Sequence, residues 1–307
     1  MKRFLIKSFG ILLPLFIFIG AMEAVIRHIP NDYSMKNEVM ATRGKDMKIL
    51  CLGNSQTYYG VDPQYFDMPA YNCAHVSQQL HVDNFIFNKF ADELDSLKYL
   101  FLNISYFSHL QSFFDGQEAW RAKYYYLYYD YPKKDVPFKY QFEFYNLNFS
   151  SLTNIMKGLS GAPLYHIDKN GFGTKYKLEN KPSDWEECQF IARQVHTITP
   201  NEETLKHNYA CVDNISRKCK EKGVRLILFT TPCWHTYTEI VDTTQLSSSV
   251  EFAKYFASKY DNVEYLDFFT DSRFVADDFY DAYHLSNVGA EKMTHILNDY
   301  IKKQERQ

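Results

Sequence analysis

The sequence predicts an α/β fold with a mostly parallel sheet, because two patterns occur together. Five short apolar runs have the length and composition of strands that are buried on both faces of a parallel sheet. Amphipathic helical patterns separate several of these runs, and strands that alternate with helices are typical of a sheet covered by helices. The five runs are residues 48–53, 70–74, 97–105, 224–231 and 263–268.

Two of the helical patterns are especially clear. Apolar residues recur at intervals of three and four over 205–219, and Gly223 follows as a helix C-terminal signal just before the fourth apolar run. The same spacing recurs over 290–301, and either Ser286 or Asn287 can cap the start of that helix. Both helices therefore adjoin predicted strands, as an α/β sandwich requires.

Length and composition bound the class of protein. The 307 residues suffice for one large domain or two small ones. The chain has 34 Lys and Arg against 37 Asp and Glu, and the resulting charge of −3 argues against a nucleic-acid partner. Hydrophobic residues make up 46%, so the chain is globular rather than disordered. Six cysteines without C-x-x-C spacing indicate neither a zinc site nor a thioredoxin-like motif.

The N-terminus contains an apolar segment that just reaches across a bilayer. Residues 8–22 carry no charge and follow three basic residues, and a bilayer core needs about 20 helical residues. Because the segment ends in a poor cleavage sequence, we predict an uncleaved signal anchor or transmembrane helix over 1–27; a cleaved signal peptide and a buried first helix are the alternatives. Basic residues favour the cytoplasmic side. We therefore expect residues 28–307 outside the cytoplasm, anchored to the inner membrane, and periplasmic in a Gram-negative cell.

A tyrosine-rich stretch interrupts the alternation of strands and helices. It covers about 106–200 and includes the aromatic segments 123–132 and 138–149. This stretch is predicted to be an insertion or cap over the sheet. The tyrosines at 124–131 suit stacking on sugar rings, because their faces are apolar and their hydroxyls are polar, and a packed cap is the other interpretation.

A serine follows the first predicted strand directly. The chain reads Gly53-Asn54-Ser55-Gln56 there, and Gly53 permits a tight turn. Ligands of parallel α/β sheets bind beyond the carboxyl ends of the strands. Ser55 is therefore a candidate nucleophile, and backbone N–H groups near Gln56 can face a developing oxyanion. Taken alone, the same sequence also suits a turn or a helix cap.

A carboxylate and a histidine precede the last predicted helix. Asp281 is three residues ahead of His284, so both can reach one site. An imidazole can accept a serine proton, and a neighbouring carboxylate fixes its tautomer. Asp277 and Asp278 extend this acidic loop, but the spacing does not suit a metal site. We predict neither a metal nor a cofactor.

These features together resemble the SGNH or GDSL-type hydrolase superfamily. Gly53-Asn54-Ser55 stands where that family has Gly-Asp-Ser, and Asp281 and His284 stand where its catalytic Asp and His lie. The resemblance implies a three-layer α/β/α sandwich with a five-stranded flavodoxin-like sheet. It also implies ester hydrolysis or acyl transfer by a Ser-His-Asp triad.

The resemblance covers about 48–105 and 224–303, and it is closest to exported, membrane-anchored members found beside cell-surface polysaccharide machinery. Two blocks depart from the family pattern. The second block lacks the Gly whose N–H joins the oxyanion hole, and the third, usually Gly-x-Asn-Asp, offers only Asn103 or Ser105. The oxyanion-hole candidates are Gln56, Ser77, Gln78 and Asn103, and the substrate-pocket candidates are Asn54, His75 and His235.

Two classes of function follow from these residues. The first is an extracytoplasmic serine esterase or O-acyltransferase that acts on an acylated cell-envelope glycan, with a lipid or peptide ester as another substrate. The second is a catalytically silent scaffold or binding subunit of a polysaccharide assembly complex, which the two altered blocks favour. Hydrolysis and transfer share one acyl-enzyme, so the sequence leaves them open. Polysaccharide-assembly proteins are the expected partners in either case.

Overall fold

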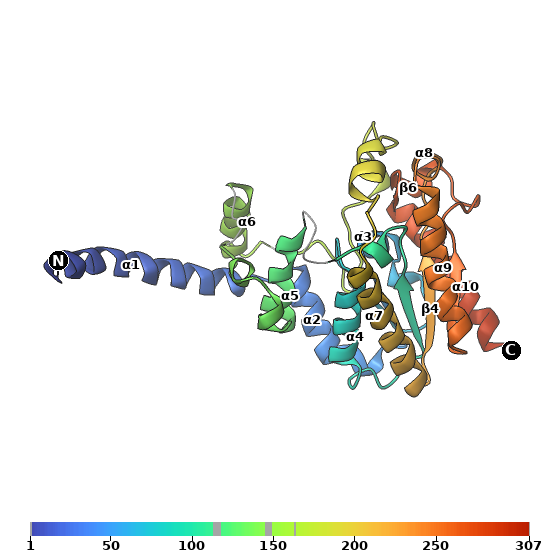
Figure 1. Ribbon diagram of the computed structural model, residues 1–307, viewed down its shortest axis with the longest axis horizontal. Helices are drawn as coiled ribbons and strands as arrows, with labels where there is room; N and C mark the ends of the chain where they lie inside the picture. The colour runs from blue at the N-terminus through green and yellow to red at the C-terminus, as the bar shows by residue number, and fades with distance from the viewer. Residues whose placement is uncertain (1, 113–117, 145–148, 163, 307) are drawn as a thin grey trace. The chain divides into compact units, whose positions relative to one another are not determined.

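The structure is a computed structural model that describes residues 2–112, 118–144, 149–162 and 164–306 (Figure 1). Contacts divide the chain into two compact units. The first unit, here the N-terminal unit, is Met1–Asn37 with Gln117–Tyr165, and the second, here the sheet unit, is Glu38–Gly116 with His166–Gln307.

The sheet unit contains a five-stranded sheet in which every neighbouring pair is parallel. The strands are β1 (Ile49–Leu52), β2 (Ala70–Asn72), β3 (Tyr99–Asn103), β4 (Arg225–Thr230) and β5 (Val263–Asp267), in the order β2-β1-β3-β4-β5. All five predicted strands are therefore confirmed, and the order is flavodoxin-like. The order reverses beside β1, so the carboxyl ends of β1 and its neighbours open onto the crevice where ligands of such sheets bind.

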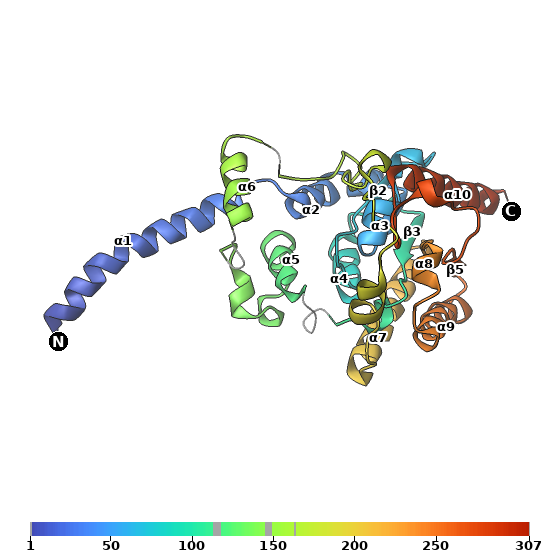
Figure 2. The same ribbon diagram turned by 90° about the horizontal axis from the view of Figure 1, so that it is seen from above.

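Helices cover both faces of the sheet. The helices α4 (Leu80–Phe90), α7 (Glu202–Glu221) and α9 (Thr243–Lys259) pack in sequence against one another, whereas α10 (Asn287–Glu305) packs with α3 (Ser55–Gly60). Figure 2 shows α10 and α7 on opposite sides of the sheet. The predicted three-layer sandwich is confirmed.

Alternate residues of the strands face opposite layers, which is why the strands are apolar throughout. Cys51, Phe101 and Phe229 form one buried cluster with Met293 and Leu297 of α10. Their neighbours along the strands, such as Leu50 and Leu102, are equally buried toward the other layer. Burial on both faces holds the carboxyl ends of the strands at fixed positions.

The predicted helix ends are also found. Ser286 is the N-cap of α10, and its hydroxyl accepts the N–H of Gly289, so Ser286 rather than Asn287 has this role. Gly223 follows α7 with φ +69°, in the left-handed region that favours glycine. Short elements of the sheet unit include α8 (His235–Thr238), β6 (Phe279–Asp281) and β7 (His284–Leu285).

The N-terminal unit consists of helices. They are α1 (Lys2–Arg27), the first part of α2 (Asp32–Arg43), α5 (Ala122–Tyr129) and α6 (Phe149–Leu159). Within α1, Phe9–Arg27 is long and apolar enough to cross a membrane, which suits either an anchor or a signal sequence. The side of the membrane on which the rest of the chain lies stays a prediction.

The stretch 106–200 is divided between the two units. Its tyrosine-rich part, 117–165, belongs to the N-terminal unit, where Tyr125 and Tyr129 are fully buried and Tyr124 stacks on Tyr33 at 4.6 Å. Tyr125 and Tyr129 are therefore core residues, whereas the other tyrosines of 124–131 are partly exposed and sugar stacking by them stays a prediction. Whether 117–165 covers the carboxyl edge of the sheet stays a prediction.

The later part of the same stretch belongs to the sheet unit and begins with an irregular segment, here called the strap (residues 166–181). Asn72 donates its N–H to the Asn170 carbonyl at 2.9 Å, and Gly173 donates to the Tyr58 carbonyl at 2.9 Å. Gly171 has φ +81°, and a Cβ there would lie 2.1 Å from the Asn72 carbonyl oxygen. Glycine is therefore required where the strap crosses the end of β2.

Candidate active site

The turn after β1 places Ser55 at the edge of the sheet. Gly53 has φ +131°, and a Cβ there would lie 2.7 Å from the Cβ of Asn103, so no other residue fits. Asn54 is the N-cap of α3, and its side-chain oxygen accepts the Gln56 N–H at 2.9 Å. Ser55 is thereby held as the first residue of the helix, and it is only partly buried.

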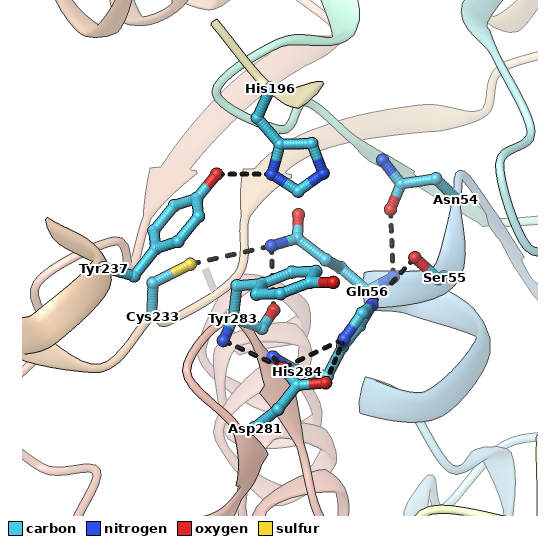
Figure 3. Close-up of polar contacts among 9 residues, drawn as sticks. All are labelled: Asn54, Ser55, Gln56, His196, Cys233, Tyr237, Asp281, Tyr283 and His284. Carbon is cyan, nitrogen blue, oxygen red and sulfur yellow. Dashed lines mark hydrogen bonds and ion pairs between the residues drawn. The ribbon is translucent and has the colours of Figure 1, made fainter. Parts of the chain in front are cut away.

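Three side chains form a continuous hydrogen-bonded chain at this edge. His284 Nε2 lies 2.8 Å from Ser55 Oγ, and His284 Nδ1 lies 2.9 Å from Asp281 Oδ2 (Figure 3). A carboxylate can only accept, so Nδ1 carries the proton and donates to Asp281. Nε2 is then the acceptor, and the serine hydroxyl donates to it.

The short hairpin of β6 and β7 holds this geometry. Asp281 ends β6 and His284 begins β7, and the carboxylate of Asp281 also accepts the backbone N–H groups of Tyr283 (3.1 Å) and His284 (2.9 Å). Three N–H groups therefore fix one carboxylate. The histidine side chain is 6% exposed and can change its position little.

Behind Ser55, a buried hydroxyl joins three side-chain amides. Ser105, which follows β3, accepts from Asn54 Nδ2 at 2.6 Å, and its Oγ lies 2.5 Å from Gln56 Oε1 and 2.6 Å from Asn103 Oδ1. One hydroxyl proton serves these two acceptors in turn. Ser105 is fully buried, so this cluster ties the turn after β1 to the end of β3.

Hydrogen bonds within the fold engage three predicted oxyanion donors, which are Gln56, Gln78 and Asn103. The backbone N–H of Gln56 donates to the Asn54 side chain, as described above. The amide nitrogen of Asn103 donates to the Phe229 carbonyl at 3.3 Å, while its oxygen faces Ser105. The Gln56 N–H is therefore used within the turn, whereas Asn103 keeps a second N–H that has no partner in the described residues.

The second block supplies a different donor. Gln78 donates its N–H to the His75 carbonyl at 3.1 Å, which closes a turn, and Ser77 within that turn has φ +59°. Glycine usually takes such a left-handed position. In the described part of the chain, the backbone N–H groups of Ser55 and Ser77 donate no hydrogen bond, and both residues are partly exposed.

The three pocket candidates lie in different surroundings. Asn54 is buried and both ends of its amide are engaged. His75 is 1% exposed, and its N–H donates to the Gly53 carbonyl at 3.3 Å, so it lies beneath the site. His235 faces outward on α8, 3.5 Å from Glu239, and the structure does not bring it to Ser55.

A stack of three tyrosines beside the histidine was not evident in the sequence. Tyr176 of the strap stacks on Tyr59 at 3.7 Å and on Tyr280 at 4.0 Å, with its edge toward His284 at 5.3 Å. Tyr176 and Tyr280 remain partly exposed. Because the strap is far from both partners in sequence, no local pattern could have placed Tyr176 here.

A second buried histidine borders the site from the side opposite Asp281 in Figure 3. His196 Nδ1 lies 2.8 Å from the Tyr237 hydroxyl, and its ring meets Tyr283 at 5.1 Å. Burial, aided by the positive charge that His284 can carry, lowers the pKa of His196 to about 3, so His196 is neutral. Burial likewise raises the pKa of the neighbouring Cys233 thiol, which therefore does not compete as a thiolate nucleophile.

The acidic loop contributes an ion pair beside the site. Asp278 is buried and pairs with Lys292 of α10 at 2.6 Å. In the described residues, no group of three or more His, Cys, Asp or Glu side chains could hold a metal ion.

Comparison with known proteins gives distant structural likenesses alone. No protein-family model and no curated protein matches this chain. A proposed platelet activating factor from Streptococcus pneumoniae is similar at TM-score 0.45 and 13% identity, covering 96% of this chain and 99% of that one. A proposed acylhydrolase from Bacteroides fragilis is similar at TM-score 0.44 and 13% identity, covering 89% of this chain and 95% of that one. A GDSL-like lipase from Bacteroides thetaiotaomicron is similar at TM-score 0.43 and 11% identity, covering 88% of this chain and 98% of that one. Because these TM-scores are all below 0.5, we base no argument about fold or activity on them.

A buried carboxyl supports the turn after β1 from below. Asp83 of α4 accepts from Gln78 Nε2 at 2.7 Å and from the backbone N–H of Gly53. Burial raises its pKa from 3.8 to about 7. Asp83 thus connects the first and second blocks, and it is protonated in the folded protein at mildly acidic pH.

We predict that Asp83 makes stability fall as pH rises from about 4 to 7. Between these pH values the carboxyl keeps its proton in the folded protein and has lost it in the unfolded chain. The contribution of Asp83 to the free energy of unfolding is therefore complete below pH about 4 and is lost as the pH rises through about 7. Urea unfolding of Asp83→Asn should show a pH dependence weaker by roughly 2–4 kcal/mol. The exposed Asp92→Asn is the control, and an unchanged pH dependence in Asp83→Asn would refute the assignment.

Proposed function

We propose that this chain is a membrane-anchored, extracytoplasmic serine esterase or O-acyltransferase of the SGNH type. The observation that carries the proposal is the chain of hydrogen bonds from Ser55 through His284 to Asp281. Its order and contacts are those that activate a serine hydroxyl for attack on an ester. The expected membrane anchor and the resemblance of the motifs support the cellular setting.

The residues allow a complete acyl transfer. Ser55 Oγ attacks the acyl carbonyl carbon while His284 Nε2 takes its proton, and Asp281 stabilises the imidazolium. The tetrahedral oxyanion is held by the free backbone N–H groups of Ser55 and Ser77. When the ester bond breaks, His284 returns the proton to the leaving alkoxide and the acyl group stays on Ser55. Water or an acceptor hydroxyl then gives its proton to His284 and attacks the acyl carbon. The bond to Ser55 Oγ breaks, His284 returns the proton to Ser55 Oγ, and the acyl group leaves as the acid or the new ester.

Partly exposed tyrosines support an acylated glycan as the substrate class. Tyr280 in β6 and Tyr283, directly before His284, are both partly exposed, and rings with hydroxyl groups suit both the apolar face and the polar edge of a sugar. The same rings also suit other esters of moderate size. Transfer instead of hydrolysis requires an acceptor that excludes water from the acyl-enzyme.

The silent-scaffold alternative has one observation in its favour. One N–H of the Asn103 amide is used by the Phe229 carbonyl, so only the second N–H remains for an oxyanion. Loss of one such donor typically costs about 100- to 1,000-fold in rate. The two N–H groups that remain free favour a slow enzyme over an inactive one.

We predict that the three triad residues act as one unit. Turnover of acetylated sugars and model acetyl esters should disappear in Ser55→Ala and His284→Ala, and Asp281→Asn should lower kcat by up to about 10,000-fold because the wrong tautomer forms. Ser258→Ala on the surface of α9 is the control. Wild type that folds but turns over no acetylated sugar, acyl lipid or model ester would support the scaffold instead.

We also predict that His196 donates a hydrogen bond to the substrate. The Tyr237 hydroxyl has no other partner in the described part of the chain, so it donates to His196 Nδ1 and leaves the proton on Nε2. His196→Phe keeps the ring that stacks on Phe107 and should lower kcat/KM about 10- to 100-fold.

His196→Gln keeps an N–H donor and should recover part of that loss. Thermal unfolding is measured in parallel, because a purely packing role would lower Tm in both variants and leave the ratio of their kcat/KM values near one. Such a result would contradict a substrate contact.

A further inference from the structure

The last turn of α1 is built into the N-terminal unit. The carboxylate of Glu23 accepts the backbone N–H groups of Glu143 at 2.8 Å and Phe144 at 3.1 Å. Arg27 pairs with Glu23 at 2.8 Å and donates to the Gln141 carbonyl at 3.0 Å. These polar contacts fix the end of α1 against residues 141–144.

Apolar contacts continue the same junction. Ile26 and Ile29 form a buried cluster with Ile155 of α6, and Phe144 and Leu164 pack against it. Removal of the chain through Ala24 would take away the carboxylate that binds two backbone N–H groups. The end of α1 is therefore part of the core of this unit, as a retained anchor requires and a discarded signal peptide does not.

Upstream of this junction, α1 exposes apolar side chains on all sides. Ile11 and Ile17 are 76% and 63% exposed, and Phe16 and Phe18 are similar. Such a continuous apolar surface is unfavourable in water and normal in lipid. Within the described residues, no other segment covers it.

The helix α6 lies across the end of α1, and both views show the two axes at a steep angle (Figures 1 and 2). Met156 and Leu159 on α6 are 68% and 51% exposed, and Lys157 between them is exposed as well. A helix with exposed apolar side chains and an exposed lysine, set across the end of a membrane span, has the geometry of an interfacial helix.

A second exposed patch in this unit has the same composition. Phe138 is 73% exposed and is in edge contact with Phe142, and three exposed lysines, Lys133, Lys134 and Lys139, accompany the two rings. Aromatic rings beside lysines suit the headgroup region of a bilayer that contains anionic lipid.

We propose that α6 and the Phe138–Phe142 patch rest on the lipid surface, and that α1 is retained as the anchor that holds them there. The N-terminal unit then contacts the membrane both through the span and through its surface. Continuity with the apolar span favours lipid over a protein partner as the occupant. The inference rests on the anchor part of the proposed function and is independent of the ester chemistry.

The experiment uses the full-length protein in vesicles of phosphatidylethanolamine and phosphatidylglycerol. All six native cysteines are buried, so a cysteine introduced at an exposed position can be labelled selectively with an environment-sensitive fluorophore. Separate proteins carry Met156→Cys in α6, Ile17→Cys in α1, and Val275→Cys, an exposed position of the sheet unit. Nitroxide lipids with the quencher at the headgroup or at mid-chain report the depth of each probe.

The proposal predicts loss of fluorescence at position 156 with headgroup nitroxide, loss at 17 with mid-chain nitroxide, and quenching at 275 by aqueous iodide alone. If the probe at 156 responds only to iodide, or to neither quencher, the lipid contact is refuted while a lipid-buried probe at 17 keeps the anchor. If 17 also responds to iodide, or if the mature chain begins after Ala24 by mass spectrometry, anchor and contact both fail. Ester turnover is measured in each variant and tests the proposed catalytic function independently of the membrane contact.

Discussion

The carboxylate of Asp281 is the group on which the geometry of the site depends. It can only accept hydrogen bonds, and it takes three of them, from the Tyr283 and His284 backbone and from His284 Nδ1. One carboxylate therefore fixes both the hairpin and the tautomer of the histidine. The remaining nitrogen of His284 then faces Ser55, which lies 229 residues away in the chain. The parallel sheet brings His284 and Ser55 together, because the turn after β1 and the segment after β5 both start at the carboxyl edge of the sheet.

The surroundings of the triad remove competing ionisations. Burial holds His196 neutral and Cys233 as a thiol, which leaves His284 and Ser55 as the proposed base and nucleophile. Behind them, Ser105 and the side-chain amides around it form a buried polar cluster in which each amide has its orientation set by a second partner. Such a cluster is rigid when its groups are paired, and this rigidity holds the turn after β1 in place.

The sequence predicted the strands, the α10 cap and the residues that form the Ser55–His284–Asp281 chain, because each depends on local periodicity or on a short motif. It did not predict contacts that depend on distant segments. Tyr176 and His196 reach the site through an insertion whose path no local pattern encodes. The bond from Asn103 to the Phe229 carbonyl likewise could not be predicted, because its partner belongs to the adjacent strand. Ser77 is a third case. The family that the sequence resembles has a glycine in this block, and the backbone here keeps the left-handed conformation with a serine.

The most direct test of a nucleophilic Ser55 is covalent labelling of the full-length protein with a fluorophosphonate, with the adduct located by peptide mass spectrometry. The serine oxygen displaces fluoride from phosphorus and His284 takes the proton, so labelling requires the same activated hydroxyl as ester attack. The account predicts one phosphonyl group per chain, on Ser55, and its loss when the protein is unfolded or when His284 is replaced. Stoichiometric labelling of any other residue, or none on a folded protein that retains its Tm, would contradict it.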